Sequence, residues 1–577
     1  MFRTLMSGAV SALTLSAAAF AQRRFGLIIA GAVLASIFAG LPISTVEAQS
    51  GIVGHGQKAG KRFPFKAQRE LPQLTPEEER LLEENLRHTH QGPLVPEAPA
   101  SQTPAGAKQQ NQAPTAPQTE VLGNGTTTFT TFLSTILQPV DAFGVAEPQA
   151  ATNGPIVFYT ANPIAAFSTD GGASFTFVSP FTQFGHLDGG FCCDQTVIYE
   201  PTRDQMIWQL QYGFSQDTGK GSYVTAFANP ASVESAGWCM YEWNPGDFNL
   251  GPGLWLDYPH VALSSNFVWY SANIFSGGGD SRYLTSVIWR IPLDVAANNC
   301  ASQPFDYFSA TSTSFTQVEG ATDTMYFGSH IDTASMRIYT WAEADSTPSS
   351  TDVNVSRWPE NMLYSCPGPD GLNWCTREDG RILTGWISNG VIGFMWNASQ
   401  GSGALGDFPY PYVHVARFDA STLALIDEPI IWNEGGAFAY PAVTVNDRGD
   451  IAGTLYFGGG IYFPIMTALI MDDLSPAPPP WEVYGIVGSD GGSRLWGDYY
   501  SSRRNASFPF TWVIAGQAKS QDRVYGYYVW MGRDRDAPPQ AMTSLGVQGT
   551  SPTSASSDYL RFWWEDVLRQ RPPARSP

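Results

Sequence analysis

The chain contains a repeating pattern in which an acidic residue or a tyrosine comes just before an apolar segment. These acidic and tyrosine side chains are the ones that could take part in chemistry. Carboxyl groups can act as general acid and base or bind Ca²⁺, and a Tyr/His pair can donate and accept a proton. We expect a catalytic set of Asp194, Asp257, Tyr258 and His260, and a ligand-binding set of Glu319, Asp379, Tyr440 and Asp498. Each residue alone has the simpler interpretation of a turn cap or a structural histidine, whereas the shared position favours a common site.

The segments that these residues introduce are short strands. Between residues 139 and 533, runs of Val, Ile, Tyr, Phe and Trp are interrupted by Gly, Asp, Asn and Pro, without long amphipathic helical patterns. Similar units begin near Glu147, Asp194, Asp257, Glu319, Asp379, Tyr440 and Asp498, at intervals of roughly 45 to 65 residues. Repeats of this size predict an all-β fold, a β-propeller of seven blades, with six or eight as alternatives. The first strands of propeller blades converge, so the recurring residues would meet at a central mouth.

The N-terminus has the features of a leader. Residues 1–48 are apolar and small around Arg23-Arg24 and end in "TVEAQS", which fits cleavage after Ala48. We therefore expect a secreted or periplasmic protein, with an uncleaved leader that anchors the chain in a membrane as the alternative.

Two further regions flank the expected propeller. Residues 49–138 are rich in Pro, Gln, Thr and Ala, and they predict a flexible linker or pro-region interrupted by a short helix over 76–88. Residues 534–577 predict a tail that ends in a short amphipathic helix around "YLRFWWEDVL" and docks on the domain.

The charge of the chain limits its partners. The net charge is -20, and lysine after the N-terminal region is confined to Lys220 and Lys519. An acidic surface repels phosphate backbones, so nucleic acid is excluded as a partner. A glycan or another small ligand at the mouth is expected instead. Ca²⁺ is the one cofactor that the acidic pattern suggests, and no metal-ligand set can be identified.

The six cysteines are expected to form disulfides in an exported chain. Cys366 and Cys375 flank the turn-rich "PGPDGLNW", which a local disulfide would close, and Cys239 and Cys300 pair by elimination. The adjacent Cys192 and Cys193 would form an eight-membered ring, with bonding elsewhere or free thiols as alternatives. Zinc is disfavoured because no second Cys/His cluster has ligand spacing.

The segment "FSTDGGASF" resembles the Asp-box of sialidase-like propellers. Its residues fit the pattern Ser-x-Asp-x-Gly-x-Ser/Thr-Trp/Phe, and they are Ser168, Asp170, Gly172, Ser174 and Phe175. The short polar side chains would bond the backbone of a tight turn, glycine would permit a positive φ, and the aromatic ring would anchor the hairpin. In that superfamily the box is structural, so the resemblance implies a fold.

The same resemblance implies a chemistry that can be compared with this sequence. Sialidases grip a carboxylate with three arginines, one of them in a Phe/Tyr-Arg-Ile-Pro motif, and use a Tyr/Glu nucleophile pair. Arg290 in "WRIP" is the candidate for that arginine, although "VIWRIPLD" also fits an outer strand. We expect a glycoside hydrolase at the mouth. The alternatives are a polysaccharide lyase that uses His260 and Tyr258, and a non-catalytic propeller that binds carbohydrate or protein.

Overall fold

The computed structural model describes the chain from residue 51 to residue 536 with gaps. The described ranges are 51–68, 75–76, 80, 95–99, 112–123, 128–139 and 146–536, without 163, 186, 188, 279–280, 295–299, 361–362, 477–480 and 495. The predicted leader over 1–48, most of the predicted helix over 76–88 and the predicted C-terminal helix lie outside these ranges. No helix in the described part is long and apolar enough to cross a membrane.

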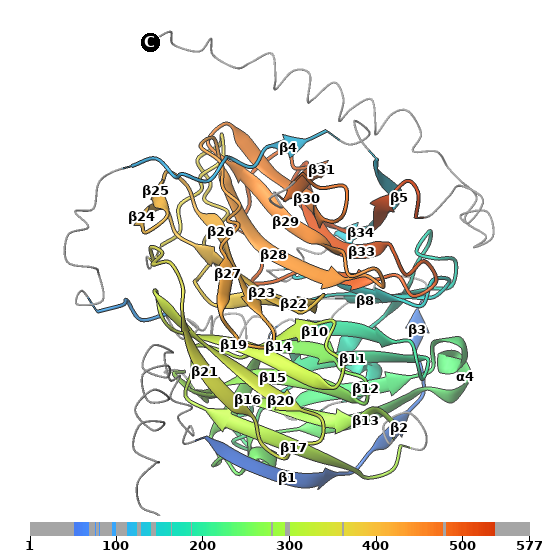
Figure 1. The fold of residues 1–577 in the computed structure, drawn as a ribbon. Helices are drawn as coiled ribbons and strands as arrows, with labels where there is room; N and C mark the ends of the chain where they lie inside the picture. Colours follow the sequence, from blue (N-terminus) through green and yellow to red (C-terminus); the bar gives the residue numbers. More distant parts are fainter. Residues whose placement is uncertain are drawn as a thin grey trace, which may run out of the picture. The chain divides into compact units, whose positions relative to one another are not determined.

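The described chain folds into successive antiparallel sheets of four strands (Figure 1), and short helical segments connect some of the strands. The first sheet contains β6 (Gln149–Thr152), β7 (Val157–Ala161), β8 (Ile164–Ser168) and β9 (Thr176–Val178). The second contains β10 (Phe191–Glu200), β11 (Gln205–Tyr212), β12 (Tyr223–Ala228) and β13 (Trp238–Trp243). The third contains β14 (Leu254–Leu263), β15 (Phe267–Ser276), β16 (Tyr283–Pro292) and β17 (Gln303–Ala310). Among these strands the described chain forms short helices. α3 (Pro180–Gln183) connects the first sheet to the second, η2 (Pro230–Ser232) and α4 (Val233–Ala236) connect β12 to β13, and η3 (Pro245–Phe248) connects the second sheet to the third.

Four more sheets follow in chain order. They are β18 (Thr316–Glu319), β19 (Thr324–Asp332), β20 (Ser335–Ala342) and β21 (Ser349–Asn354); β22 (Ile382–Ser388), β23 (Val391–Ala398), β26 (Tyr412–Asp419) and β27 (Leu425–Asp427); β28 (Ala437–Val445), β29 (Ile451–Gly459), β30 (Tyr462–Met471) and β31 (Glu482–Gly488); and β32 (Ser501–Arg504), β33 (Trp512–Ser520), β34 (Arg523–Arg533) and β5 (Phe129–Pro139). A parallel pairing of β18 with β22 joins two of them, and β24 (Gly401–Gly403) with β25 (Gly406–Phe408) forms a small hairpin.

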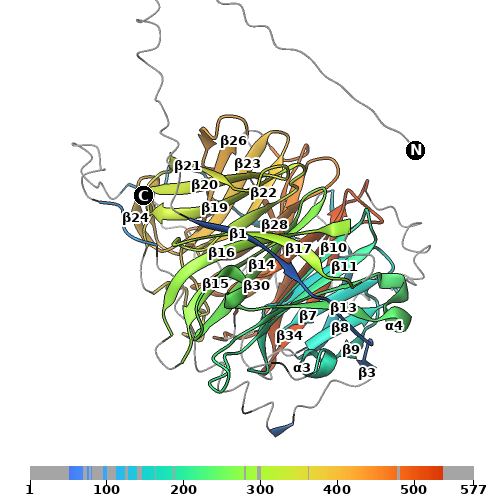
Figure 2. The same cartoon turned by 90° about the horizontal axis from the view of Figure 1, so that it is seen from below.

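The first strands of these sheets form a closed series of contacts. In the described residues β6, β10, β14, β18, β22, β28 and β32 contact one another in that order, and β32 contacts β6. The view in Figure 2 shows the same succession of sheets from below. This is the topology of a β-propeller. The all-β propeller fold predicted from the sequence is therefore confirmed.

Aromatic side chains fill the space between neighbouring sheets. Trp243 on β13 lies 5.8 Å from Trp289 on β16, measured between ring centroids, and both rings are fully buried. Trp386 on β22 lies 5.8 Å from Trp481, which precedes β31. Large rings suit these wedges because each buries a wide apolar area. These four tryptophans are therefore core residues.

Described parts of the segment before the propeller pair with its sheets, whereas the sequence predicted a flexible linker or pro-region over 49–138. Its strands are β1 (Ile52–Lys58) on β17, β2 (Lys61–Phe63) on β13, β3 (Ala67–Gln68) on β9, β4 (Val121–Leu122) on β31, and β5 on β34. Its composition cannot form a core of its own, which is why the sequence predicted a linker. An extended segment needs only the unpaired edge of an existing sheet to satisfy its backbone groups.

The hairpin between β8 and β9 has the hydrogen bonds expected of the Asp-box pattern. The Ser168 Oγ accepts from the Gly172 N–H at 2.9 Å, and the Asp170 carboxylate accepts from the Ser174 N–H and hydroxyl at 2.9 and 2.6 Å. Gly172 has a φ of 93°, and a Cβ there would lie 2.3 Å from the Tyr528 ring. The segment is thus a packed structural turn. Its membership of the Asp-box family stays a proposal.

Three disulfides join all six cysteines. They pair Cys192 with Cys193, Cys239 with Cys300, and Cys366 with Cys375. These are the pairings that spacing and elimination suggested. The first lies within β10, where the ladder with β11 is irregular between Phe191 and Gln195.

Candidate functional site

Irregularities in the first strands turn side chains toward the centre of the propeller. The ladder shifts between Asp257 and His260 in β14 and between Ala439 and Ala442 in β28. Tyr258 and Tyr440, inside these shifts, have φ values of 59° and 56°, and Glu147 before β6 has a φ of 45°. Each of the three precedes a proline, which normally confines the preceding residue to extended backbone. Such a conformation costs about 1–3 kcal/mol and is typical of functional sites.

A buried pair of carboxyl groups lies where β6 and β10 begin. Glu147 is 1% exposed and shares a hydrogen bond with Asp194, which is 9% exposed. The Glu147 carboxyl also accepts from the Asp498 N–H at 2.8 Å and from the Asn162 amide at 3.1 Å. Burial, followed by the neighbouring carboxylates, raises the pKa of both carboxyls, and that of Asp194 well above its usual range. Burial therefore favours the protonated form of this pair.

Asp257 adds a third carboxyl beside this pair. Its Oδ1 accepts from the Gln211 amide and from the Tyr258 N–H, both at 2.8 Å. Its negative charge is one of the causes that raise the pKa of Asp194. A carboxyl group with a raised pKa thus lies near a second carboxyl group that accepts two hydrogen bonds. Acid–base catalysis commonly uses such a pair of carboxyl groups.

Two arginines at the mouth are already engaged by carboxylates. Arg377 binds Asp498 in a two-pronged ion pair with both N–O distances at 3.1 Å, and Arg381 binds Asp379 at 2.6 Å. The Arg381 guanidinium also lies 3.8 Å above the Tyr258 ring. The side chains of Arg377, Asp498 and Asp379 are 28%, 18% and 18% exposed. These ion pairs are therefore partly exposed to solvent.

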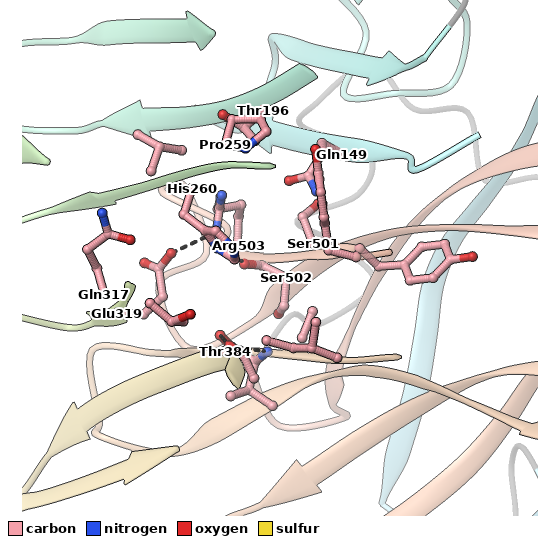
Figure 3. Close-up of a pocket in the computed structure, with 17 residues that line it drawn as sticks. Gln149, Thr196, Pro259, His260, Gln317, Glu319, Thr384, Ser501, Ser502 and Arg503 are labelled. Atoms are coloured by element: carbon pink, nitrogen blue, oxygen red, sulfur yellow. Dashed lines mark hydrogen bonds and ion pairs between the residues drawn. The ribbon is translucent and has the colours of Figure 1, made fainter. Parts of the chain in front are cut away.

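A narrow cavity lies among the first strands of the sheets (Figure 3). Its volume is about 50 Å³, and its lining includes residues from all seven first strands: Gln149, Thr196, His260, Gln317, Thr384, Ala442 and Ser502. Such a space holds a few water molecules but no sugar ring. Figure 3 shows Arg503 bound to Glu319 across it, at 2.7 Å. A second pocket of about 290 Å³ lies apart from it and is lined by Glu97, Thr333, Arg357, Trp358, Pro359, Glu360, Gln400, Gly401 and Ser402.

Tyr258, His260 and Tyr499 form a ring cluster between the cavity and the carboxyls. Their centroids lie 4.8 to 5.9 Å apart. Burial, reinforced by Arg381 and Arg503, lowers the pKa of His260 to about 3, so the imidazole is neutral. Burial raises the pKa of both tyrosines well above the usual range. In the described part of the chain, neither the Tyr258 hydroxyl nor the His260 Nε2 has a hydrogen-bond partner.

The structure brings most of the predicted site residues together. Asp257 and Asp498 act electrostatically on Asp194, and Asp379 and Asp498 act on Tyr258. His260 and Glu319 line the central cavity. Tyr440 lies beside Tyr500, with its hydroxyl 3.4 Å from the Trp374 carbonyl oxygen that accepts from it. The roles assigned to these residues stay predictions.

The placement of Arg290 contradicts its assignment as a catalytic arginine. It lies on β16, the third strand of its sheet, and its Nε donates to Asp306 at 3.0 Å. Its guanidinium stacks on Phe267 and Trp341 and donates to the Asp345 carbonyl oxygen at 2.6 Å. Arg290 thus ties two sheets together far from the first strands. The "WRIP" segment is the outer strand that its apolar alternation also allowed.

Four residues of the site were missing from the predicted set. Glu147 precedes a proline at the start of its repeat unit, as Tyr258 and Tyr440 do in theirs. The repeat pattern could therefore have identified Glu147 as a site residue. Tyr499 directly follows Asp498 and could have been found the same way. Arg377 and Gln211 come from a loop and from a second strand, and no pattern in one sequence marks them.

The acidic groups are not arranged as a preformed metal site. In the described residues, one group of three acidic, Cys or His ligand atoms lies within 4.8 Å, and it consists of Cys366, Cys375 and Glu378. Both cysteines are disulfide-bonded, so this group lacks the thiolates that bind metal.

The sequence matches no protein-family profile and no curated protein. Similar solved structures include a variant of the Synechocystis ACO, with a TM-score of 0.35 and 9% identity over 61% of this chain and 73% of that one. A variant of the NanB sialidase from Streptococcus pneumoniae has a TM-score of 0.35 and 8% identity over 66% and 82%. The Trypanosoma rangeli sialidase in complex with sialic acid has a TM-score of 0.30 and 10% identity over 64% and 56%. Identities of 8 to 10% and TM-scores of at most 0.35 are too low for these likenesses to carry an argument about this chain.

Proposed function

We propose that the protein is a glycoside hydrolase that cleaves a glycan at the mouth of the propeller. The observation that carries this proposal is the buried, hydrogen-bonded carboxyl pair of Glu147 and Asp194 beside the Asp257 carboxylate. Glycosidic bonds are commonly hydrolysed by one protonated and one ionised carboxyl group. The raised pKa of the pair supplies the first, and Asp257 the second.

In this reaction the pair protonates the oxygen of the departing sugar. Asp194 is the more exposed member and delivers the proton, while Glu147 shares it in the ground state. Asp257 stabilises the positive charge that develops on the sugar ring and assists the addition of water. The water supplies OH to one product and the proton that restores the pair, so the catalyst is regenerated.

The state of the arginines argues against the sialidase mechanism. A sialoside needs unpaired guanidinium groups to grip its carboxylate, yet Arg377, Arg381 and Arg503 each bind a carboxylate of this chain. The proposal is therefore limited to glycans without a carboxylate at the cleaved sugar.

A polysaccharide lyase is the second candidate, because the Tyr258 and His260 rings are 4.8 Å apart and His260 is neutral. A neutral imidazole can remove a proton, and a tyrosine can return one. The same paired arginines weaken this candidate, since elimination requires neutralisation of a uronate carboxylate. Export to an oxidising compartment accompanies either proposal, since three disulfides persist there.

Purified protein should be incubated with neutral, amino, sialylated and uronate oligosaccharides. Hydrolysis releases reducing ends, whereas elimination produces an unsaturated uronate that absorbs ultraviolet light. We expect reducing ends only, abolished by Asp194→Asn and retained by Asp352→Asn, which removes an exposed carboxylate on β21. An unsaturated product supports the lyase. Saturable glycan binding without any product supports the non-catalytic alternative and contradicts both reactions.

A further inference from the structure

The pocket of about 290 Å³ is larger than the central cavity of about 50 Å³, and the two share no lining residue. Its walls come from Glu97, Thr333, residues 357–360 and residues 400–402. At about 30 Å³ per water molecule, it has room for about ten waters or for one hexose ring. It can therefore admit a ligand that the central cavity excludes.

Arg357 in the wall of this pocket has a guanidinium group without a hydrogen-bond acceptor among the described residues. Its one ion pair there is with Glu97, at an N–O distance of 3.6 Å, which is too long for a hydrogen bond. Arg377, Arg381 and Arg503, by contrast, bind carboxylates at 3.1 Å or less. A guanidinium group offers five N–H donors, so those of Arg357 remain available to a ligand.

Two further polar groups of the wall lack a partner. Trp358 is 1% exposed, and its indole N–H donates to no residue in the described part of the chain. The Glu360 Oε2 accepts from the Tyr364 hydroxyl at 2.6 Å, whereas the Glu360 Oε1 has no partner among the described residues. Buried polar groups are usually hydrogen-bonded. The wall therefore contains an unused donor and an unused acceptor in addition to Arg357.

Gly380 packs against this wall and connects it with the mouth. A Cβ at Gly380 would lie 2.3 Å from the Trp358 ring and 2.5 Å from the Glu360 Oε2, and the Gly380 N–H donates to the Glu360 carboxyl. Contacts this close leave no space behind the two side chains. The neighbours of Gly380 are Asp379 and Arg381, which form an ion pair at the mouth. The pocket and the proposed reaction site are thus built on the same segment of the chain.

The charges in the wall balance one another. The ionisable lining residues are Glu97, Arg357 and Glu360. Burial, reinforced by the nearby Asp379, raises the pKa of Glu360 to about 8, so its neutral form predominates at pH 7. The charge of Arg357 is then matched by that of Glu97. A neutral wall with both donors and acceptors favours a neutral ligand, and hydroxyl groups both donate and accept.

We propose that this pocket is a second glycan-binding site, which holds one neutral sugar residue away from the reacting carboxyls. Sugar hydroxyls accept from the Arg357 guanidinium and donate to the carboxyl groups of Glu97 and Glu360. Glu147 and Asp194 do not line the pocket, so it contributes affinity and no chemistry. A second site on the same chain strengthens the binding of a long substrate. The inference rests on the proposed function for the choice of a glycan among neutral ligands that carry hydroxyl groups.

Calorimetry on the full chain tests this site. Oligomers of glucose, galactose and mannose should be titrated at pH 7, with glucosamine and galacturonate oligomers of equal length as charged comparisons and mass spectrometry to follow products. Arg357→Met keeps the aliphatic stem and removes the guanidinium group. For the neutral oligomer that binds wild type, we expect at least about 10-fold weaker binding. We also expect KM to rise without an equal fall in kcat.

Two more variants complete the comparison. Arg535→Met is the control, because the Arg535 side chain is 41% exposed against 36% for Arg357 and also pairs with an exposed carboxylate. It should bind the oligomer like wild type. Ser402→Trp fills the pocket from an exposed position of the wall and should weaken binding as much as Arg357→Met. Circular dichroism and melting temperatures check that all three variants fold.

The outcomes distinguish this inference from the proposed function. Weaker binding in both wall variants but not in the control supports the inference, and if wild type then cleaves nothing, the hydrolase alone is contradicted. Wild-type affinity in both wall variants overturns the inference and leaves the hydrolase standing where cleavage still depends on Asp194. A charged oligomer that loses more affinity in Arg357→Met than the neutral ones do overturns the choice of a neutral ligand. No binding of any oligosaccharide contradicts both.

Discussion

At the scale of single residues, the chemistry depends on carboxyl groups whose ordinary pKa values have been moved by burial. Burial, followed by the repulsion between neighbouring carboxylates, raises the pKa of both Glu147 and Asp194. The sequence predicted Asp194 and Asp257 from their recurring position, and in the fold both lie on first strands, β10 and β14. It could not predict Gln211 or Arg377, because partners from other strands are chosen by the three-dimensional packing.

Asp194→Asn tests the role of the proton donor. An amide cannot donate an acidic proton, so we expect kcat/KM on the cleaved glycan to fall by about 10²–10⁴-fold. The wild-type rate should decline on the alkaline side, because a carboxyl with a raised pKa is active only while protonated. Initial rates between pH 4 and 9 measure both effects. An unchanged rate in the variant would remove Asp194 from the mechanism.

A second histidine gives a prediction for stability. His330 is buried between Trp358 and Trp396, and in the described residues neither ring nitrogen has a hydrogen-bond partner. Burial, with a contribution from His414, lowers its pKa to about 3. The unfolded chain gains a proton there below about pH 6.5, whereas the folded chain does not. Stability is therefore lost as pH falls from 6.5 toward 3.

His330→Phe should lessen this dependence on pH. We expect the slope of unfolding free energy against pH between 6 and 4 to decrease by up to about 1.4 kcal/mol per unit, since one titrating group is removed. Urea unfolding at several pH values measures the slope. A slope equal to that of the wild type would show that His330 binds its proton equally well in both states.

At the scale of elements, irregular first strands place the site. Regular alternation would point neighbouring residues of β14 to opposite faces, whereas the shift between Asp257 and His260 brings Asp257, Tyr258 and His260 to one centre. The alternation in the sequence predicted the strands themselves. For Arg290 the sequence allowed two interpretations, a catalytic arginine and a residue of an outer strand. The structure places Arg290 on an outer strand, where its guanidinium packs against Phe267 and Trp341.

The Cys192–Cys193 disulfide lies in the irregular part of β10, directly before Asp194. Replacing both cysteines by serine allows this backbone more conformations without altering the charge of the mouth. We expect a several-fold decrease in kcat/KM and a smaller effect for the paired replacement of Cys366 and Cys375, which lie outside the first strands. Rates and melting temperatures should be compared. A rate equal to the wild type would show that Asp194 is positioned without the disulfide.

At the scale of the whole molecule, the N-terminal segment belongs to the propeller. β5 supplies the fourth strand of the last sheet, and Phe129 on it stacks 4.3 Å from Tyr484 of the preceding sheet. The composition predicted a linker because the segment has too few apolar residues to form a hydrophobic core of its own. It does not report which strand edges elsewhere in the chain are available, so this part of the fold was beyond the sequence.

Two truncations test the structural role of this segment. Removal of residues 1–50 should leave the melting temperature nearly unchanged, because the described strands begin after them. Removal of residues 1–139 exposes the edge of β34 and the buried side chains of Phe129 and Leu137. We expect insoluble protein or a melting temperature lowered by more than about 10 °C, because the loss of these contacts lowers the free energy of unfolding by several kcal/mol. Equal melting temperatures would restore the linker interpretation.

The central claim is that a proton-holding carboxyl pair at the mouth of the propeller hydrolyses a glycan. Its most direct test is single-turnover hydrolysis of a neutral sugar oligomer by wild type, Glu147→Gln and Asp194→Asn, with Asp352→Asn as the control. We predict that wild type and control release reducing ends at equal rates and that both mouth variants bind the oligomer without cleaving it. Equal cleavage by all four proteins would contradict the account.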